Sequence, residues 1–356
     1  MSVFKSVIAA LGALALSSAA ALAQEKTKVG FIYVGPIGDH GWSYQHNEGR
    51  LAIEKEFGDK VETTYVENVS EGPDAERAIE RLARDGNQLI FTTSFGFMNP
   101  TLKVAGKFPD VKFEHATGFK RADNVSTYSA RFYEGRYVIG QIAAKVSKNG
   151  VAGYVASFPI PEVVRGINAF VLGARSVDPD FKLKVVWVNS WFDPGREADA
   201  AKALIDQGAD IITQHTDSPA PLQIAAERGV YGFGQASDMH KFAPDNQLTA
   251  IVDNWNDYYI ARTKAVMDGT WESQDVWGGF AANMVNMAPY TNLPDDVVAM
   301  AKQTTADIAS GKLHPFKGPI RKQDGSEVIG EGESLSDEVL LGMNYYVEGV
   351  EGDLPQ

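Results

Sequence analysis

Short runs of β-branched and aromatic residues alternate with longer amphipathic patterns along most of this chain, in two series. Compact apolar runs predict strands, whereas apolar residues three and four apart predict helices. Such an alternation is typical of parallel sheets with helices on both faces, so we expect an α/β fold with two doubly wound lobes. The first series predicts strands at 28–34, 61–66, 88–93, 111–116 and 125–129, and helices at 42–57, 73–85 and 99–107. After a helix at 133–147, the second predicts strands at 151–156, 183–188, 210–214, 230–234 and 248–252, and helices at 161–175, 195–207 and 219–228.

The end of the chain is less regular. A helix is expected to end at Gly269, extended strands to follow at 276–288, and a last helix to end at Gly311. Residues 331–356 carry scattered glycines and acids and are predicted to form a C-terminal surface tail. The 356 residues exceed what one hydrophobic core usually organises, which favours two domains.

The first 23 residues have the pattern of a secretory signal peptide. Lys5 precedes a run of small and apolar residues that ends in Ala21-Leu22-Ala23, an A-x-A cleavage signature. A membrane anchor is the alternative, but the apolar run is short for a bilayer span. The sequence contains no cysteine, so it has neither disulfides nor the residue that a lipoprotein anchor needs. A free periplasmic protein is therefore predicted.

The charge balance excludes two kinds of partner. The formal net charge is −13, and it becomes −14 when Lys5 leaves with the signal peptide. Such a surface repels nucleic acid and anionic lipid, and no basic run offsets the repulsion. No later segment approaches twenty uninterrupted apolar residues, so no membrane insertion is expected.

Ligands of parallel α/β sheets bind beyond the carboxyl ends of the strands. In this chain, the loops that follow the predicted strands are rich in aromatic residues. We expect some of these rings to stack on a flat ligand. For Trp42 the alternative is a residue at the start of a helix that packs on the core of its lobe. The aromatic candidates are Trp42, Phe95, Phe97, Phe158, Trp191 and Trp255.

Polar residues of the same loops supply further candidates. Acids there suit a ligand with several N–H or O–H donors, although an aspartate after a strand also caps the following helix. His215 is either a ligand contact or a loop histidine satisfied by the protein. The polar candidates are Asp39, Ser43, Ser94, His215, Asp217, Asp238 and Asp253.

Motifs for metal binding and catalysis are missing. The histidines lack the close spacing of metal ligands, so no metal and no cofactor are predicted. The sequence has no G-x-S-x-G elbow and no phosphate loop, and "GPIGDHG" at 35–41 has the wrong spacing for a dinucleotide site. A binding protein without chemistry of its own is expected. A periplasmic hydrolase that uses an aspartate on nucleosides or sugars is the alternative.

Several motifs together resemble one family. They are the "GD" with Trp42 and Glu48-Gly49, "FYEGRYVIGQIAA" (132–144), "GYVASFPIPEVVRGINAFVLGA" (153–174), "WFDPGREADAAKALIDQGADII" (191–212), "ERGVYGFGQASD" (227–238) and "LTAIVDNWND" (248–257). In this order they resemble the basic membrane protein family of ABC-transporter substrate-binding proteins, the PnrA-like purine nucleoside receptors.

The resemblance implies a type I periplasmic binding fold, in which two lobes joined by three crossing segments close on a small ligand. The expected lobes are 24–131 with 255–277, and 132–254 with 278–330. The ligand would pass to an ABC permease in the inner membrane, and the receptor is expected to be a monomer. Asp39, Trp42 and Asp238 match cleft residues of the family, and Phe158 falls where the second lobe contacts the base.

Three departures from the family pattern bear on the ligand. Ser43 stands where many members have asparagine, Asp253 where they have lysine, and "HTDSPA" at 215–220 replaces a glycine-rich loop. Loss of a lysine donor and gain of an acid should change the accepted hydrogen-bond pattern. A purine nucleobase or nucleoside is predicted, with another small solute as the alternative. A sensor that delivers its ligand to a signalling receptor would have the same sequence features.

Overall fold

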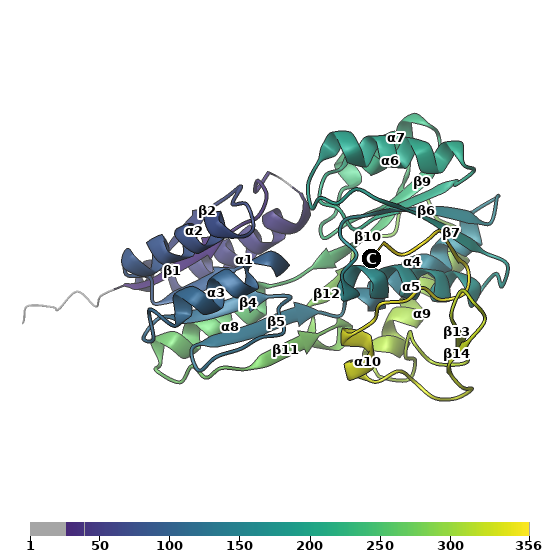
Figure 1. Cartoon of the computed structure of the whole chain (residues 1–356). Helices are drawn as coiled ribbons and strands as arrows, with labels where there is room; N and C mark the ends of the chain where they lie inside the picture. Colours follow the sequence, from purple (N-terminus) through teal and green to yellow (C-terminus); the bar gives the residue numbers. More distant parts are fainter. Residues whose placement is uncertain (1–25, 39, 356) are drawn as a thin grey trace, which may run out of the picture.

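The structure is a computed structural model that describes residues 26–38 and 40–355. The predicted signal peptide, 1–23, and the candidate Asp39 lie outside the described residues. The chain forms two largely parallel sheets flanked by helices (Figure 1). Every strand and helix of the two predicted series is present, with bounds that differ from the prediction by at most two residues. The predicted α/β fold class is therefore confirmed.

The first sheet has the strand order β11-β5-β4-β3-β1-β2, with all neighbours parallel. Its central strand β3 is buried along its whole length, which explains its continuous apolar run. Helix α1 packs against α8, and α2 packs against α3. The strands are β1 (Thr27–Ile32), β2 (Val61–Val66), β3 (Leu89–Thr92), β4 (Lys112–Ala116), β5 (Val125–Ala130) and β11 (Asp275–Gly278). The helices are α1 (Gly41–Phe57), α2 (Pro73–Arg84), α3 (Met98–Ala105) and α8 (Asn256–Met267).

The second sheet has the order β12-β10-β9-β8-β6-β7-β15, in which only the β10–β12 pair is antiparallel. Helices α4 and α5 pack closely because Gly140 and Gly173 bring backbone against backbone. Its strands are β6 (Val151–Ala156), β7 (Lys182–Trp187), β8 (Ile211–Gln214), β9 (Tyr231–Gly234), β10 (Gln247–Asp253), β12 (Val285–Met287) and β15 (Val350–Glu351). Its helices are α4 (Phe132–Val146), α5 (Pro161–Arg175), α6 (Pro194–Asp206), α7 (Ala220–Glu227) and α9 (Asp295–Ala309).

The chain passes between the sheets three times, from β5 to α4, from β10 to α8 and from β11 to β12. Hydrogen bonds tie these crossings together. The backbone N–H of Arg131 donates to the carbonyl oxygen of Gly278 at 2.7 Å, and that of Asn254 donates to Met284 at 3.0 Å. The carboxylate of Glu134 accepts the N–H of Phe280 at 2.7 Å. The three crossings therefore form one connected strip between the sheets.

The last residues are more integrated than a surface tail. Strand β15 pairs with β7 at the edge of the second sheet, and Leu340, Met343 and Val347 are buried. Asp337 accepts two hydrogen bonds from Arg131, at 2.7 and 2.6 Å. The C-terminal segment is therefore bonded to the crossing from β5 to α4. The remaining elements here are α10 (Asp337–Leu341) and the antiparallel pair β13 (Ile320–Arg321) and β14 (Glu327–Ile329).

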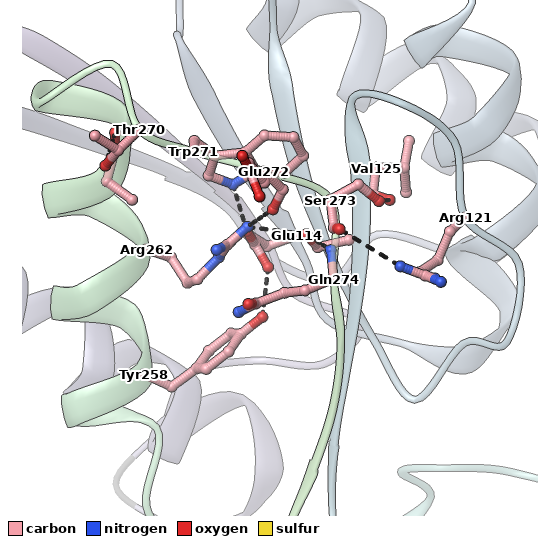
Figure 2. A network of polar contacts seen from close by, with 12 residues as sticks. Glu114, Arg121, Val125, Tyr258, Arg262, Thr270, Trp271, Glu272, Ser273 and Gln274 are labelled. Carbon is pink, nitrogen blue, oxygen red and sulfur yellow. Dashed lines mark hydrogen bonds and ion pairs between the residues drawn. The ribbon is translucent and has the colours of Figure 1, made fainter.

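A buried ion pair fixes α8 to the first sheet. Figure 2 shows Glu114 of β4 surrounded by the side chains of Arg262 and Tyr258 from α8 and of Trp271 from the following loop. The guanidinium Nε of Arg262 donates to Glu114 at 2.5 Å, the hydroxyl of Tyr258 at 2.6 Å and the indole N–H of Trp271 at 2.7 Å. Both charges are almost fully buried, so each depends on the other for its hydrogen bonds.

Candidate ligand-binding site

A cavity of about 390 Å³ lies between loops that follow strands of both sheets. This position beyond the carboxyl ends of the strands is the one expected for ligands of parallel α/β sheets. Pockets of about 300–1,000 Å³ hold ligands up to drug size, so this cavity suits a small solute. The loops of the first sheet contribute Val34, Gly35, Pro36, Trp42, Asn68, Ser70, Glu71, Ser94, Phe95 and Thr117. The loops of the second contribute Phe158, Glu162, Asn189, Ser190, Trp191, Phe192, His215, Thr216, Asp217 and Gln235.

Aromatic rings line the cavity from both sides. Phe158 and Trp191 contact each other with ring centroids 5.0 Å apart and planes tilted by 58°. On the opposite side, the indole N–H of Trp42 donates to the carbonyl oxygen of Thr93 at 2.6 Å, which orients its ring. Phe95 lines the same side. A flat apolar ring placed between these groups would lose its contact with water on both faces.

Glu71 joins the two sides at the rim. One carboxylate oxygen accepts hydrogen bonds from the Ser94 hydroxyl at 2.6 Å and from the Gly96 backbone N–H at 2.9 Å, both on the first side. The same oxygen accepts the indole N–H of Trp191, from the second side, at 3.2 Å. Trp191 is therefore oriented by an acid of the opposite lobe.

Asp217 caps a helix that belongs to the other lobe. Its carboxylate accepts the backbone N–H of Trp42, in the first turn of α1, and α1 has no side-chain cap of its own at His40. Next to it, the N–H of Gly41 donates to the hydroxyl of Ser237 at 2.6 Å. Gly41 has φ +86, and a Cβ there would lie 2.7 Å from the carbonyl oxygen of Asp217, so only glycine fits this contact.

Burial changes the protonation of Asp217. Removal of the carboxyl from water raises its pKa to about 7, and nearby Glu197 adds to the rise, although the N–H groups of Trp42 and Ser43 oppose it. The acid therefore titrates near neutral pH while it caps α1.

His215 and Glu162 form a second polar pair in the cavity wall. Nε2 of His215 lies 3.4 Å from the Glu162 carboxylate, and Nδ1 lies 3.4 Å from the hydroxyl of Tyr154. Burial lowers the pKa of His215 despite Glu162, so the ring is neutral at pH 7. His215 has protein partners and it also lines the cavity.

Asp253 and Arg136 are two buried ionisable side chains with no hydrogen bond between them. Asp253 is 3% exposed, and neither of its carboxyl oxygens has a hydrogen-bond partner among the described residues. Burial is the main reason that its pKa is well above the usual range; Glu162 adds to the rise and Arg136 opposes it. Arg136 donates instead to the hydroxyl of Thr213 at 3.2 Å and to the side chain of Gln235.

The structure brings seven of the predicted residues to the cavity wall and places five others elsewhere. Ser43 is buried and accepts the N–H of Gly35, and Phe97 and Trp255 are fully buried in hydrophobic clusters. Asp238 is exposed and accepts hydrogen bonds from Gln247 and His240. The fifth is Asp253, which is buried and does not line the cavity. The residues in the wall are Trp42, Ser94, Phe95, Phe158, Trp191, His215 and Asp217.

Sequence reasoning missed several polar residues of the wall. Asn68, Thr117 and Asn189 each have a positive φ, of 57°, 61° and 52°. A positive φ is uncommon for residues other than glycine, and it is rarest for a β-branched residue such as threonine. Residues in this conformation are found preferentially at functional sites. The two asparagines carry a weak sequence signal, because asparagine tolerates this conformation, whereas Thr117 carries none. The other polar groups missed are Ser70, Glu71, Glu162, Ser190, Thr216 and Gln235.

Within residues 26–38 and 40–355, no three histidine, aspartate or glutamate side chains gather as metal ligands. No helix in the same part of the chain has the length and hydropathy needed to cross a membrane.

Two parallel-sheet lobes, three crossing segments and an aromatic-lined cavity between the lobes define a two-lobed solute-binding protein. The family model described as "ABC transporter substrate-binding protein PnrA-like" matches residues 26–323. The chain therefore belongs to this family of ABC-transporter substrate-binding proteins, as its motifs predict.

Two relatives differ in what their names say they bind. A purine-binding protein of Brucella abortus is 67% identical over 337 residues, which are 95% of this chain and 96% of that protein. A protein of Haloferax volcanii, named as a glucose-binding protein of an ABC transporter, is 39% identical over 93% of this chain and 82% of its own length.

Solved structures agree on the fold. The solute-binding protein of an ABC transporter system from Aeropyrum pernix has a TM-score of 0.69 at 19% identity, and covers 83% of this chain and 92% of its own. One from Conexibacter woesei has a TM-score of 0.63 at 22% identity, with 81% and 98% covered. At these sequence identities, the comparisons show that the fold is shared and nothing more.

Proposed function

We propose that this chain captures a purine nucleobase or nucleoside in the periplasm and presents it to the permease of an ABC importer. The observation that carries the proposal is the cavity, which has aromatic rings from both lobes and hydrogen-bonding groups between them. Stacking on aromatic side chains contributes roughly 1–3 kcal/mol per base. The purine-binding relative at 67% identity supports this ligand class.

The mechanism is a closure of two lobes without chemistry. We assign residues 24–131 with 255–277 to one lobe and 132–254 with 278–330 to the other, whose sheet also includes the C-terminal strand β15, with the connected crossings as the hinge. Closure would bring Trp191 to Glu71 and Asp217 to α1, and the permease would recognise the closed form. The signal-peptide pattern and the acidic surface support a protein that is exported and free of the membrane.

Calorimetric titration of the purified protein tests the ligand class. The protein is freed of bound ligand by unfolding and refolding, then titrated with adenine, guanine, hypoxanthine, their nucleosides and glucose. We expect one purine site per chain with micromolar or tighter affinity, about 8 kcal/mol or more. Product analysis after long incubation with nucleosides should return them unchanged; released base would indicate the hydrolase alternative.

A sugar is the second candidate ligand, because of the glucose-binding relative. Aromatic rings also stack on sugars, and the polar wall could accept hydroxyl donors. Glucose binding together with no heat from any purine would assign this chain to the sugar-binding members.

A further inference from the structure

Glu71 is an acid of the cavity rim that is held in place on the side of the first sheet. It lies in the turn before α2 and lines the cavity. One of its carboxylate oxygens accepts the Ser94 hydroxyl at 2.6 Å and the Gly96 backbone N–H at 2.9 Å. A Cβ on Gly96 would lie 2.2 Å from the carboxyl carbon of Glu71, so the missing side chain leaves the space in which the carboxylate rests.

Trp191 reaches this carboxylate from the side of the second sheet. Its indole N–H donates to the same oxygen at 3.2 Å, and its ring packs on Phe158 with centroids 5.0 Å apart. The carbonyl oxygen of Trp191 accepts the backbone N–H of Asp217 at 3.0 Å. Asp217 in turn accepts the N–H of Trp42 across the cleft. These two contacts across the cleft are therefore joined on the second side, so they should form and break together.

The hydrogen bond between Trp191 and Glu71 bears on how a bound ligand leaves. Both residues line the cavity, so the bond closes part of its rim. Separation of the lobes breaks this bond, whereas capture of the ligand by the open protein comes before the bond forms. A bond made only after capture lowers the rate of release and leaves the rate of capture unchanged.

We propose that Glu71 is a positioning residue that acts through Trp191 as a latch. Its carboxylate, fixed by Ser94 and Gly96, holds the indole over the bound ligand after closure. The latch sets how long the ligand stays bound, whereas the rings and polar groups of the wall select which ligand is bound. The inference rests on the proposed function, because it needs a ligand that the two lobes enclose.

Stopped-flow measurements of tryptophan fluorescence, with adenine as the probe, test the latch. The observed rate plotted against adenine concentration gives the association rate constant as its slope and the dissociation rate constant as its intercept. Glu71→Ala should raise the dissociation rate constant by about 2- to 10-fold, the range of one hydrogen bond, and leave the association rate constant unchanged. Gly96→Ala should act in the same direction, because the added Cβ displaces the carboxylate.

A second set of variants shows whether Glu71 acts through the indole. Trp191→Phe keeps an aromatic ring but has no N–H to donate, so in this background Glu71→Ala should have a much smaller effect on release. Glu71→Gln retains an acceptor oxygen and should release adenine more slowly than Glu71→Ala. The control is Glu62→Ala, which removes an exposed acid of β2 and should leave both rate constants unchanged.

Equal dissociation rate constants for Glu71→Ala and the unmodified protein would overturn the proposal. So would a full effect of Glu71→Ala in the Trp191→Phe background, which would mean that the acid acts without the indole. A change confined to the association rate constant would also contradict a latch, because such an effect arises before closure. Absence of any adenine binding by the unmodified protein would count against the proposed ligand instead, and the same variants compared with glucose would then decide on the latch.

Discussion

Replacing Asp217 should show how much the closure of the lobes contributes to ligand affinity. In the structure its carboxyl caps α1 across the cleft, and opening would return it to water. Loss of a helix cap costs about 0.5–2 kcal/mol. Asp217→Ala should therefore weaken purine binding by about 2- to 30-fold, because closure is part of binding. Asp217→Asn keeps an acceptor and should retain most of the affinity at low pH.

The pH dependence gives a sharper test. Burial raises the pKa of Asp217 to about 7 in the closed form, whereas an exposed aspartate titrates near about 3.9. Closure then takes up a proton between these values, so it is most favourable at low pH and weakens as pH rises through 7. Affinity should fall by up to about tenfold per pH unit up to pH 7 and then level off. In Asp217→Asn this dependence should be absent.

Calorimetric titrations between about pH 5.5 and 8.5 measure both effects. The control is Asp193→Ala, because Asp193 caps α6 within its own lobe and accepts the N–H of Arg196 at 3.1 Å. This control should lower the melting temperature but leave affinity and its pH profile unchanged. Identical pH profiles for the unmodified protein and Asp217→Asn would show that the carboxyl keeps the same surroundings on closure, against this reasoning.

Three further predictions concern other contacts of the structure. Arg262→Met leaves Glu114 buried without its cation and should lower the free energy of unfolding in urea by about 3–5 kcal/mol, whereas an exposed pair lost through Arg228→Met should cost about 1 kcal/mol or less. Gly41→Ala should leave the lobes folded, as judged by circular dichroism, but should prevent closure, which small-angle scattering with saturating purine would detect as a radius that does not shrink. Trp191→Ala should weaken purine binding by about 5- to 150-fold in calorimetry, and an unchanged affinity would remove this ring from the site.

Local pattern predicted the secondary structure well because the runs are long and strongly periodic. The helix that opens at Pro73 is an example, since its buried Ile79 and Leu82 follow the helical period. The cavity was predicted in part for a similar reason, because loops after parallel strands converge at one edge of each sheet.

What the sequence did not reveal depends on contacts between distant residues. An aspartate after a strand predicts a cap on the next helix, and nothing local indicates that Asp217 caps α1 in the other lobe. Phe97 and Trp255 resemble the loop aromatics of the cavity in sequence, but packing places both in hydrophobic clusters. Glu71 lies in a turn of ordinary composition, and its role at the rim appears only when Trp191 is brought to it.

A crystal structure of the protein grown with adenine tests the central claim most directly. The account predicts one base in the cavity, between the rings contributed by the two lobes, with Asp217 still at the first turn of α1. A base bound elsewhere on the surface would contradict the account. So would a cavity that stays empty in crystals grown with adenine but is occupied in crystals grown with glucose.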